Sequence, residues 1–300
     1  MASYEYQIFD PGGNKTALVL GLGDLATDAA QRKAIQDSIF ARHKNDADGG
    51  VEQVGFINTD KSMPPQLIMT DGEFCANAIR CAAAYYHKTL RRGGDSGEHY
   101  VEIKASGAER PIKAGITTIR TAKGALMKVW AYLPPGDSAK TVVPLKDGLY
   151  WVTIEGISHL VVPQTQSIPY IRDIYANCDS KEAQSKIALE FLEKRVLGEM
   201  LYPGTACGVV FLEHIMDVLK IHPFVYVAPA DTIYYESGCG SSAASVGLIH
   251  SFLTGASVNF SLLQPSGSLI RVEVDYTMEK FSNVRISGGI EIGKTFTIDV

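Results

Sequence analysis

Hydrophobic and polar residues alternate in several short stretches of the chain, a pattern typical of β-strands with one buried face. In the first half these stretches are interleaved with two segments of helical apolar spacing, residues 27–43 and 75–92. Thr27 is the expected cap of the first helix, and Gly93 and Gly94 are expected to close the second. The predicted strands cover residues 4–9, 16–21, 51–58 and 66–70, and three further β-rich stretches end at residue 133.

The clearest break in the sequence is Pro-Pro-Gly at residues 134–136, where we expect a domain boundary. Beyond it the order of elements repeats in outline. A long amphipathic helix is predicted over residues 180–200, and a second helix, rich in small residues, begins near Cys239 and ends near Gly255. The predicted strands cover residues 150–163 with an interruption at Gly156, 206–213, 223–228, 257–263, 268–276, 281–287 and 294–299.

Composition narrows the class of protein. The 300 residues, 46% hydrophobic and 20% charged, suffice for one large domain or two smaller ones with their own cores. A net charge of −5 gives no electrostatic reason to bind nucleic acid or an acidic membrane. No apolar run approaches the roughly 18 residues that span a bilayer, and the N-terminal residues lack a signal-peptide pattern. We therefore expect a cytoplasmic protein with neither nucleic-acid nor membrane partners.

The five cysteines form no CxxC pair, so neither a zinc site nor a redox motif is indicated, and we expect free thiols and no metal. Two of them share an unusual setting. Residues 71–81 read DGEFCANAIRC and residues 235–247 read YESGCGSSAASVG, so that Cys75 and Cys239 each precede a run of tiny residues at a predicted helix start. The other three, Cys81, Cys178 and Cys207, lack such a setting and are expected to be packing residues.

Unpaired N–H groups and the positive end of the helix dipole lower the pKa of a thiol at a helix N-terminus and bind anions there. Two such thiols on opposite faces of one carbon are what inversion of a stereocentre requires. A single cysteine beside Ala and Gly is more often a small core residue. The parallel contexts of Cys75 and Cys239 in the two halves favour the catalytic interpretation.

The two motifs resemble those of a known family. FCANAIRC is similar to the MCGNGARC segment of diaminopimelate epimerases, and ESGCGSSAASVG to their ACGTGACA segment. DPGGN near the start and EQVGFI at residues 52–57 resemble two further segments of that family. The resemblance implies an α/β (α+β) fold of two pseudo-symmetric halves, each a curved mixed sheet or barrel around a central helix, with the active site between them. The halves would be residues 1–134, joined by a returning strand at 287–300, and residues 135–286.

The resemblance further implies a racemase or epimerase that uses neither pyridoxal phosphate nor a metal, with Cys75 and Cys239 as the acid/base pair. Asn77 with the Ala76 amide, and Gly240 with Ser241, would hold the substrate carboxylate. The remaining residues assigned to substrate binding are Asn14, Glu52, Gln53, His159 and Glu236, the last for the ammonium group. Members of the family are often dimers, so a homodimer is expected.

One departure bears on the substrate. Diaminopimelate epimerases follow the Glu of the second motif with an Arg that grips a distal carboxylate, and here Ser237 stands in its place. With GGN-x-T, EFC-x-NA and LLQPSGSLI, the sequence looks closer to histidine racemases that supply D-histidine for opine metallophores. Glu52 would then bind an imidazole or ammonium, unless it is a solvated strand residue, and His159 is either a pocket residue or a satisfied strand histidine.

We therefore expect interconversion of L- and D-histidine, with a diaminopimelate epimerase or a racemase of another polar amino acid as the alternatives. A binding protein that captures an amino acid at the same helix N-termini is the alternative without catalysis. A cysteine hydrolase would need a histidine partner for its thiolate, and none of the seven histidines lies in a recognisable partner motif.

Overall fold

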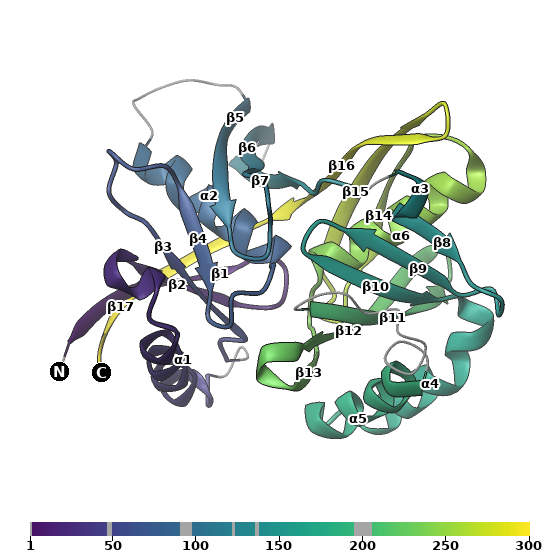
Figure 1. Cartoon of the computed structure of the whole chain (residues 1–300), viewed down its shortest axis with the longest axis horizontal. Helices are drawn as coiled ribbons and strands as arrows, with labels where there is room; N and C mark the ends of the chain where they lie inside the picture. Colours follow the sequence, from purple (N-terminus) through teal and green to yellow (C-terminus); the bar gives the residue numbers. More distant parts are fainter. Residues whose placement is uncertain (1, 47–49, 91–97, 122–123, 136–137, 195–205) are drawn as a thin grey trace. The chain divides into compact units, whose positions relative to one another are not determined.

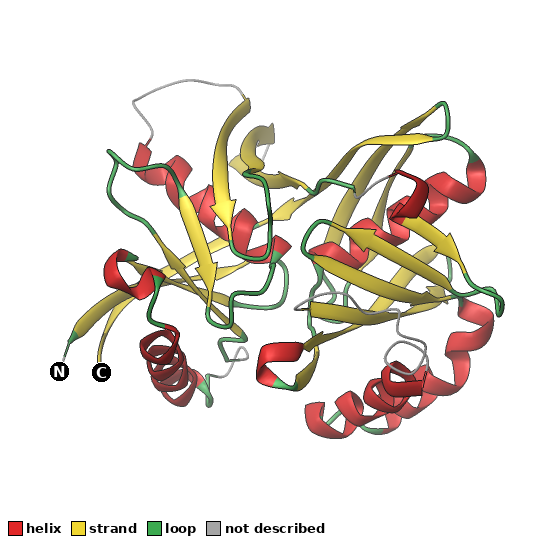
Figure 2. Cartoon of the chain, in the orientation of Figure 1, coloured by secondary structure: helices red, strands yellow, loops and turns green. Residues whose placement is uncertain are grey.

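The chain forms two compact units, Met1–Tyr132 together with Ser287–Val300, and Leu133–Ile286. This computed structural model describes residues 2–46, 50–90, 98–121, 124–135, 138–194 and 206–300 (Figure 1). Both units combine strands with helices (Figure 2), so the fold is of the mixed α+β class. No helix within the described residues is long and apolar enough to cross a lipid bilayer.

The first unit is built on a mixed sheet whose neighbouring strands follow the order β17–β1–β2–β3–β4–β5–β6–β7. The pairs β2–β3 and β4–β5 are parallel, and the others are antiparallel. The strands are β1 (Ser3–Asp10), β2 (Thr16–Leu20), β3 (Gln53–Ile57), β4 (Gln66–Met69), β5 (Glu98–Ala105), β6 (Ile112–Thr121), β7 (Gly124–Tyr132) and β17 (Glu291–Asp299). The two strands of a parallel pair must be joined by a long crossover connection, and in this unit each such connection contains a helix.

The first crossover contains a 3-10 turn, η1 (Gly23–Ala26), and α1 (Ala29–His43), and the second contains α2 (Ala76–Leu90). Four successive positions of β2, from Thr16 to Val19, are buried, because both faces of this strand are covered. Ala17 and Val19 pack with Ile35 and Ile39 of α1, while α2 contacts strands β2 to β7.

The predicted cap of the first helix is wrong by one residue. The N-cap of α1 is Asp28, whose carboxylate accepts the N–H of Gln31 at 2.8 Å. Thr27 instead ends η1, where its own N–H bonds to the carbonyl of Asp24. Aspartate is among the strongest N-cap residues, and the short 3-10 turn that competes for Thr27 has no clear sequence signal.

The second unit contains a run of neighbouring strands in the order β8–β9–β10–β11–β12–β13, of which only β10–β11 is a parallel pair among the described residues. A further pair, β14–β15, joins β12 through a parallel bridge. The strands are β8 (Val142–Pro144), β9 (Tyr150–Ile154), β10 (Ile157–Val162), β11 (Ala206–Ile215), β12 (Val218–Val227), β13 (Thr232–Tyr235), β14 (Val258–Leu263), β15 (Leu269–Thr277) and β16 (Lys280–Gly289), which runs on into the first unit.

The helices of this unit are α3 (Ser138–Thr141), α4 (Gln164–Ala176), α5 (Lys181–Leu192), a 3-10 turn η3 (Ala228–Ala230) and α6 (Gly240–Thr254). All six residues of β10 are buried. Leu160 and Val162 belong to the core formed with α4 and α5, whereas His159 lies against α6. Successive side chains of a strand point to opposite faces, so β10 is covered on both.

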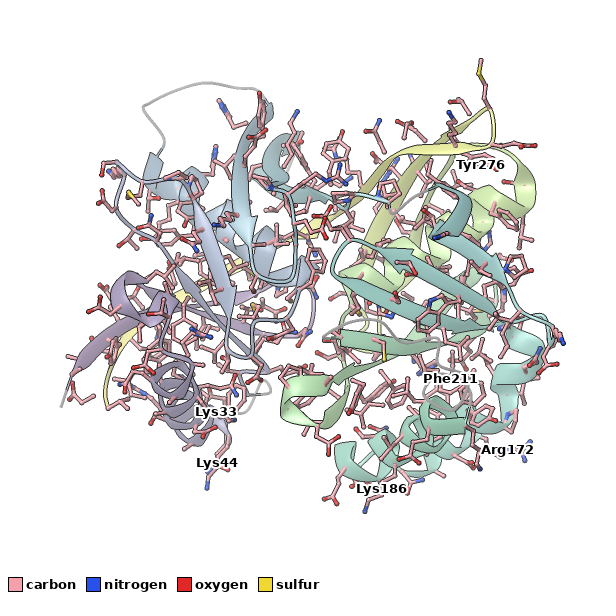
Figure 3. The ribbon with its side chains drawn as sticks, viewed as in Figure 1. Lys33, Lys44, Arg172, Lys186, Phe211 and Tyr276 are labelled. Carbon is pink, nitrogen blue, oxygen red and sulfur yellow. The ribbon has the colours of Figure 1, made fainter. Side chains whose placement is uncertain are left out.

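Helix α4 is absent from the sequence prediction, because Pro163 precedes it and Pro169 lies inside it, and both residues indicate a break. The helix predicted over residues 180–200 is α5, which ends at Leu192; residues 195–200 lie outside the described part of the chain. In Figure 3, Phe211 lies on the side of β11 that α4 and α5 cover, and Arg172 and Lys186 project from those helices into solvent.

Candidate active site

The first predicted cysteine stands at the N-terminus of α2. The carbonyl of Cys75 accepts the N–H of Ile79 at 3.1 Å, the first bond of that helix. Its sulfur accepts the N–H of Ala78 at 3.3 Å, which is the contact an N-cap side chain makes. The thiol is partly exposed, and Ala76 behind it is buried. Cys75 therefore lies at the positive end of a helix dipole.

The thiol of Cys75 donates to the side-chain oxygen of Gln53, with 3.0 Å between Sγ and Oε1. Gln53 begins β3, which pairs with β2 so that Gln53 lies opposite Thr16. The Thr16 hydroxyl reaches the same Gln53 oxygen at 3.5 Å and the carbonyl of Asn14 at 3.1 Å. The backbone N–H groups of Glu52 and Gln53 both bond to the carbonyl of Lys15, at 2.8 and 3.1 Å.

Asn14 ends a turn with an unusual backbone. Gly12, Gly13 and Asn14 all have positive φ, at 92°, 103° and 62°. The carboxylate of Asp10 accepts the N–H groups of Gly12 and Gly13 at 2.9 and 2.8 Å, and so stabilises that conformation. Glycine tolerates positive φ and asparagine tolerates it better than most residues, which explains the sequence Gly-Gly-Asn. Asn14 is buried beside strand β2.

Asn77 is buried in the first turn of α2, and its side-chain oxygen accepts a hydrogen bond from Arg80 at 3.3 Å. The structure thus brings one set of predicted residues together in the first unit. This first set comprises Asn14, Glu52, Gln53, Cys75, Ala76 and Asn77.

The second predicted cysteine is the N-cap residue of α6. The carbonyl of Cys239 accepts the N–H of Ala243 at 3.1 Å, and its sulfur lies 3.3 Å from the hydroxyl of Ser241. Its own N–H donates to the side-chain oxygen of Gln264 at 2.9 Å. The side chain of Cys239 is buried, and eleven residues of α6 are buried as well, beginning with Gly240 and Ser241.

Cys239 is held in its protonated form. Burial raises the pKa of the Cys239 thiol, and the nearby negative charge of Glu236 raises it further, against the smaller effect of hydrogen bonds from Ser241 and Ser242. The helix dipole alone would lower this pKa. Desolvation and the Glu236 carboxylate outweigh it, so Cys239 is a thiol at neutral pH. Glu236 is itself largely buried, and its N–H bonds to the carbonyl of Pro223 at 3.0 Å.

His159 is fully buried against the first turn of α6. Its Nε2 lies 3.0 Å from the hydroxyl of Ser241, and its Nδ1 lies 3.5 Å from that of Ser242. Burial lowers the pKa of His159 to about 3, so the ring is neutral. Gly208 lies opposite His159 in the sheet, and a Cβ there would stand 2.4 Å from Nδ1. The ring therefore occupies space that only glycine leaves open.

These contacts form a second set in the second unit, comprising His159, Glu236, Cys239, Gly240 and Ser241. The chain of contacts from His159 through Ser241 to Cys239 makes the histidine a support for the helix start. Within the described residues, no group of three His, Cys, Asp or Glu side chains is arranged to hold a metal ion.

Sequence reasoning missed three buried residues that contact these sets, Arg80, Gln264 and Thr16. Arg80 interrupts a run of small and apolar residues in FCANAIRC, and a charge at such a position is the signal that could have indicated it. Gln264 directly follows β14 and precedes Pro265, and only the folded chain shows that its side chain accepts the Cys239 N–H. Thr16 was likewise not expected to reach Gln53.

Comparison with solved structures defines the class of fold. A phenazine biosynthesis protein of the PhzF family from Bacillus anthracis matches with a TM-score of 0.63, at 12% identity and with 100% of both chains covered. A hydroxyproline epimerase from Agrobacterium vitis, solved with bound trans-4-OH-L-proline, also matches with a TM-score of 0.63, at 12% identity over 99% of this chain and 91% of its own. The fold is that of PhzF proteins and epimerases.

The chain belongs to the family described as histidine racemase CntK N-terminal domain, whose model matches residues 4–296. Two curated relatives are histidine racemases. The one from Staphylococcus aureus is 24% identical over 89% of this chain and 87% of its own. The one from Fusobacterium nucleatum subsp. nucleatum is 26% identical over 80% of this chain and 79% of its own. The protein is an isomerase, an amino-acid racemase.

Proposed function

We propose that this amino-acid racemase interconverts L- and D-histidine by a two-base mechanism in which Cys75 and Cys239 exchange protons with the α-carbon. The observation that carries the proposal is the matching position of the two cysteines, each standing immediately before a helix whose first residues are small and buried, in its own unit. The two histidine racemase relatives support the choice of substrate.

The two cysteines account for both proton transfers of the proposed reaction. One cysteine, as thiolate, takes the α-proton and becomes a thiol, and the electron pair moves toward the carboxylate. The other cysteine, as thiol, returns a proton to the opposite face and becomes the thiolate. The raised pKa of Cys239 supports its role as the thiol of the resting enzyme. Cys75, whose thiol donates to Gln53 in this structure, acts as the first base after that proton has been lost. Solvent exchange or the reverse reaction restores the starting protonation.

The substrate carboxylate gains negative charge as the proton leaves, so it needs donors placed in advance. We assign this task to the side chain of Asn77, the Ala76 amide, and the first amides of α6 at Gly240 and Ser241. The Cys239 amide is already bonded to Gln264, which supports the choice of the next amides along the helix. The small side chains at these positions let a carboxylate approach the backbone.

Asn14, Glu52 and Gln53 line the rest of the pocket in this proposal, with Glu52 accepting a hydrogen bond from the substrate imidazole. Gln53 already bonds the thiol of Cys75. Glu236 takes the substrate ammonium, and His159 acts through Ser241 on the second cysteine, since both ring nitrogens contact serines of α6. Ser237, in place of a carboxylate-binding Arg, argues against diaminopimelate.

The mechanism also needs the two sets of residues on opposite sides of one substrate. We therefore propose that the units are pseudo-symmetric halves, each with its cysteine helix, α2 or α6, at the centre. The contacts of α2 with strands β2 to β7, and of α6 with β8 to β10, β12, β14 and β15, support this view. A homodimer, a cytoplasmic location and a place in metallophore synthesis stay predictions from the sequence.

The test is incubation of the purified protein with L-histidine, followed by chiral chromatography. We expect an equal mixture of enantiomers, because mirror-image molecules have equal free energy in water. Cys75→Ser and Cys239→Ser should each lower the rate by at least about 100-fold, since an alcohol is a far weaker acid than a thiol. Cys178→Ser is the matched control, because that thiol is exposed and belongs to neither set.

Other results would point to other functions. Inversion of diaminopimelate but not of histidine would identify an epimerase with a different substrate. Saturable binding of histidine without inversion, unchanged in both serine variants, would identify a binding protein. Full racemase activity in Cys75→Ser would contradict the assignment of the base.

A further inference from the structure

Arg80 is a fully buried cation that pairs with no carboxylate in the part of the chain that the structure describes. It is 0% exposed in the second turn of α2. Burial lowers the pKa of Arg80 to about 10, so the guanidinium remains charged at neutral pH. Among the described residues it forms no salt bridge with any carboxylate; its bonding partners are three backbone carbonyls and one side-chain amide. Burying a charge without an opposite charge beside it costs folding free energy, so Arg80 lowers the stability of the protein unless its hydrogen bonds offset that cost.

The guanidinium joins four parts of the first unit. Nε donates to the carbonyl of Val129 in β7 at 3.2 Å, and Nη2 donates to that of Gly289 at 3.2 Å. Nη1 donates to the carbonyl of Pro11, in the turn that leads to Asn14, and to the side-chain oxygen of Asn77, both at 3.3 Å. One cation thus contacts two segments that carry predicted substrate-binding residues.

The bond to Asn77 has a chemical consequence. A guanidinium has only donors, so the edge of the Asn77 amide that faces Arg80 must be its oxygen. The NH₂ group of the same amide is then fixed on the other edge. A carboxylate accepts hydrogen bonds and cannot donate them, so it needs that NH₂ edge.

We propose that Arg80 is a positioning residue that holds the Asn77 amide with its NH₂ group, and not its oxygen, toward the substrate carboxylate. The inference rests on the proposed function, in which Asn77 binds that carboxylate. Without Arg80 the amide can turn over, and its oxygen then repels the anion. The same guanidinium fixes the Pro11 carbonyl and so the start of the Asn14 turn.

The first test is Arg80→Lys, assayed as histidine racemisation. Lysine keeps the charge but lacks the planar fork that reaches Asn77 and the carbonyls together. We expect kcat/KM to fall roughly 10- to 100-fold in both directions, the effect of losing an oriented hydrogen bond to a charged group. Alkylation of Cys75 by iodoacetamide should keep its wild-type rate, because the sulfur contacts Gln53 and the Ala78 amide.

Arg32→Lys is the matched control. Arg32 is also buried in the first unit and donates to the carbonyls of Leu25, Ala26 and Thr70, without a bond to any residue of the first set. Its replacement should reduce stability in a similar way and leave kcat/KM for histidine unchanged. An equal loss of kcat/KM in both variants would show a merely structural role for Arg80 and overturn the inference.

The second test is Asn77→Asp, which keeps an acceptor for Arg80. The new carboxylate would form a buried ion pair with the guanidinium, so the melting temperature should not fall below that of the wild type. It would also present an oxygen in place of NH₂, so racemisation should be lost. Wild-type activity in this variant, or in Arg80→Lys, would refute the inference while the parent enzyme still racemises histidine. A parent enzyme that inverts no amino acid would instead refute the proposed function, and the inference with it.

Discussion

At the residue scale, the positions of the two cysteines follow from local sequence, whereas their partners do not. Each cysteine caps a helix that begins with a small residue: Ala76 follows Cys75, and Gly240 follows Cys239. Local signals of this kind act within one helical turn. Gln53 reaches Cys75 from 22 positions away, and Gln264 reaches Cys239 from 25. Strand register decides such contacts, and hydrophobic pattern alone does not fix it between distant strands.

His159 illustrates the same limit. Alternation along the strand predicts that it faces one side of the sheet, but not whether that side is solvent, a pocket or a helix. The structure places it against α6, fully buried. The residue that makes room for it, Gly208, lies on the parallel neighbour β11.

The burial of His159 leads to a pH prediction. Its pKa is about 3 in the folded protein against 6.5 for an unperturbed histidine. Between these values the unfolded chain binds a proton that the folded chain does not, so stability rises with pH across this window and is lost as pH falls through it. His159 therefore adds less to stability at about pH 5 than at about pH 7.5. Glu73 acts in the opposite direction, because burial raises its pKa to about 7 and the folded chain then holds a proton that the unfolded chain has lost. The effect of His159 is measured by comparing the wild type and a variant in the difference between their urea midpoints at the two pH values.

In the variant His159→Gln, the urea midpoint at about pH 7.5 minus the midpoint at about pH 5 should be lower than in the wild type, whatever the absolute stability. Some dependence should remain, because burial also lowers the pKa of His222 and of His250. An unchanged difference between the two midpoints would mean that His159 does not carry the effect.

At the element scale, the cysteine helices and most strands match the predicted segments, because apolar periodicity and small-residue runs are local features. The helix predicted over residues 75–92 is α2, Ala76–Leu90, and the end of the prediction lies outside the described residues. Helix α4 was missed because its packing against β11 outweighs the effect of Pro169. Tertiary packing overrides propensity in this way when a helix buries an apolar face.

The close approach of α6 to β15 leads to a prediction about Gly247. A Cβ at this position would stand 2.5 Å from a methyl group of Val272 and 3.1 Å from one of Val274. Gly247→Ala should therefore destabilise the protein by about 1–3 kcal/mol through overpacking, although alanine favours helices.

Leu253→Ala in the same helix is the control, because that side chain is 59% exposed and should contribute little. Urea unfolding of both variants measures the difference. A Gly247→Ala protein as stable as the wild type would show that α6 and β15 can separate without cost.

At the scale of the whole molecule, the chain leaves the first unit after Tyr132 and comes back to it at Ser287. The returning strand β17 pairs with β1, so that Tyr4 lies opposite Ile298. Neither alternation nor turn residues indicate which strand will be the partner across such a separation. Resemblance to a known family supplied the expectation of a returning strand, and the physical pattern of the sequence did not.

The central claim is that two cysteines act on opposite faces of one carbon, and the isotope content of the first product tests it most directly. In D₂O the cysteine thiol that returns a proton to the α-carbon carries deuterium before the substrate binds, and the other cysteine is a thiolate. L-histidine is then converted for a small fraction of the reaction, and both enantiomers are analysed by mass spectrometry. The account predicts D-histidine with deuterium at the α-carbon and remaining L-histidine that still has its proton. D-histidine that keeps the original proton, or L-histidine that gains deuterium as fast as D-histidine forms, would show a single base and contradict the account.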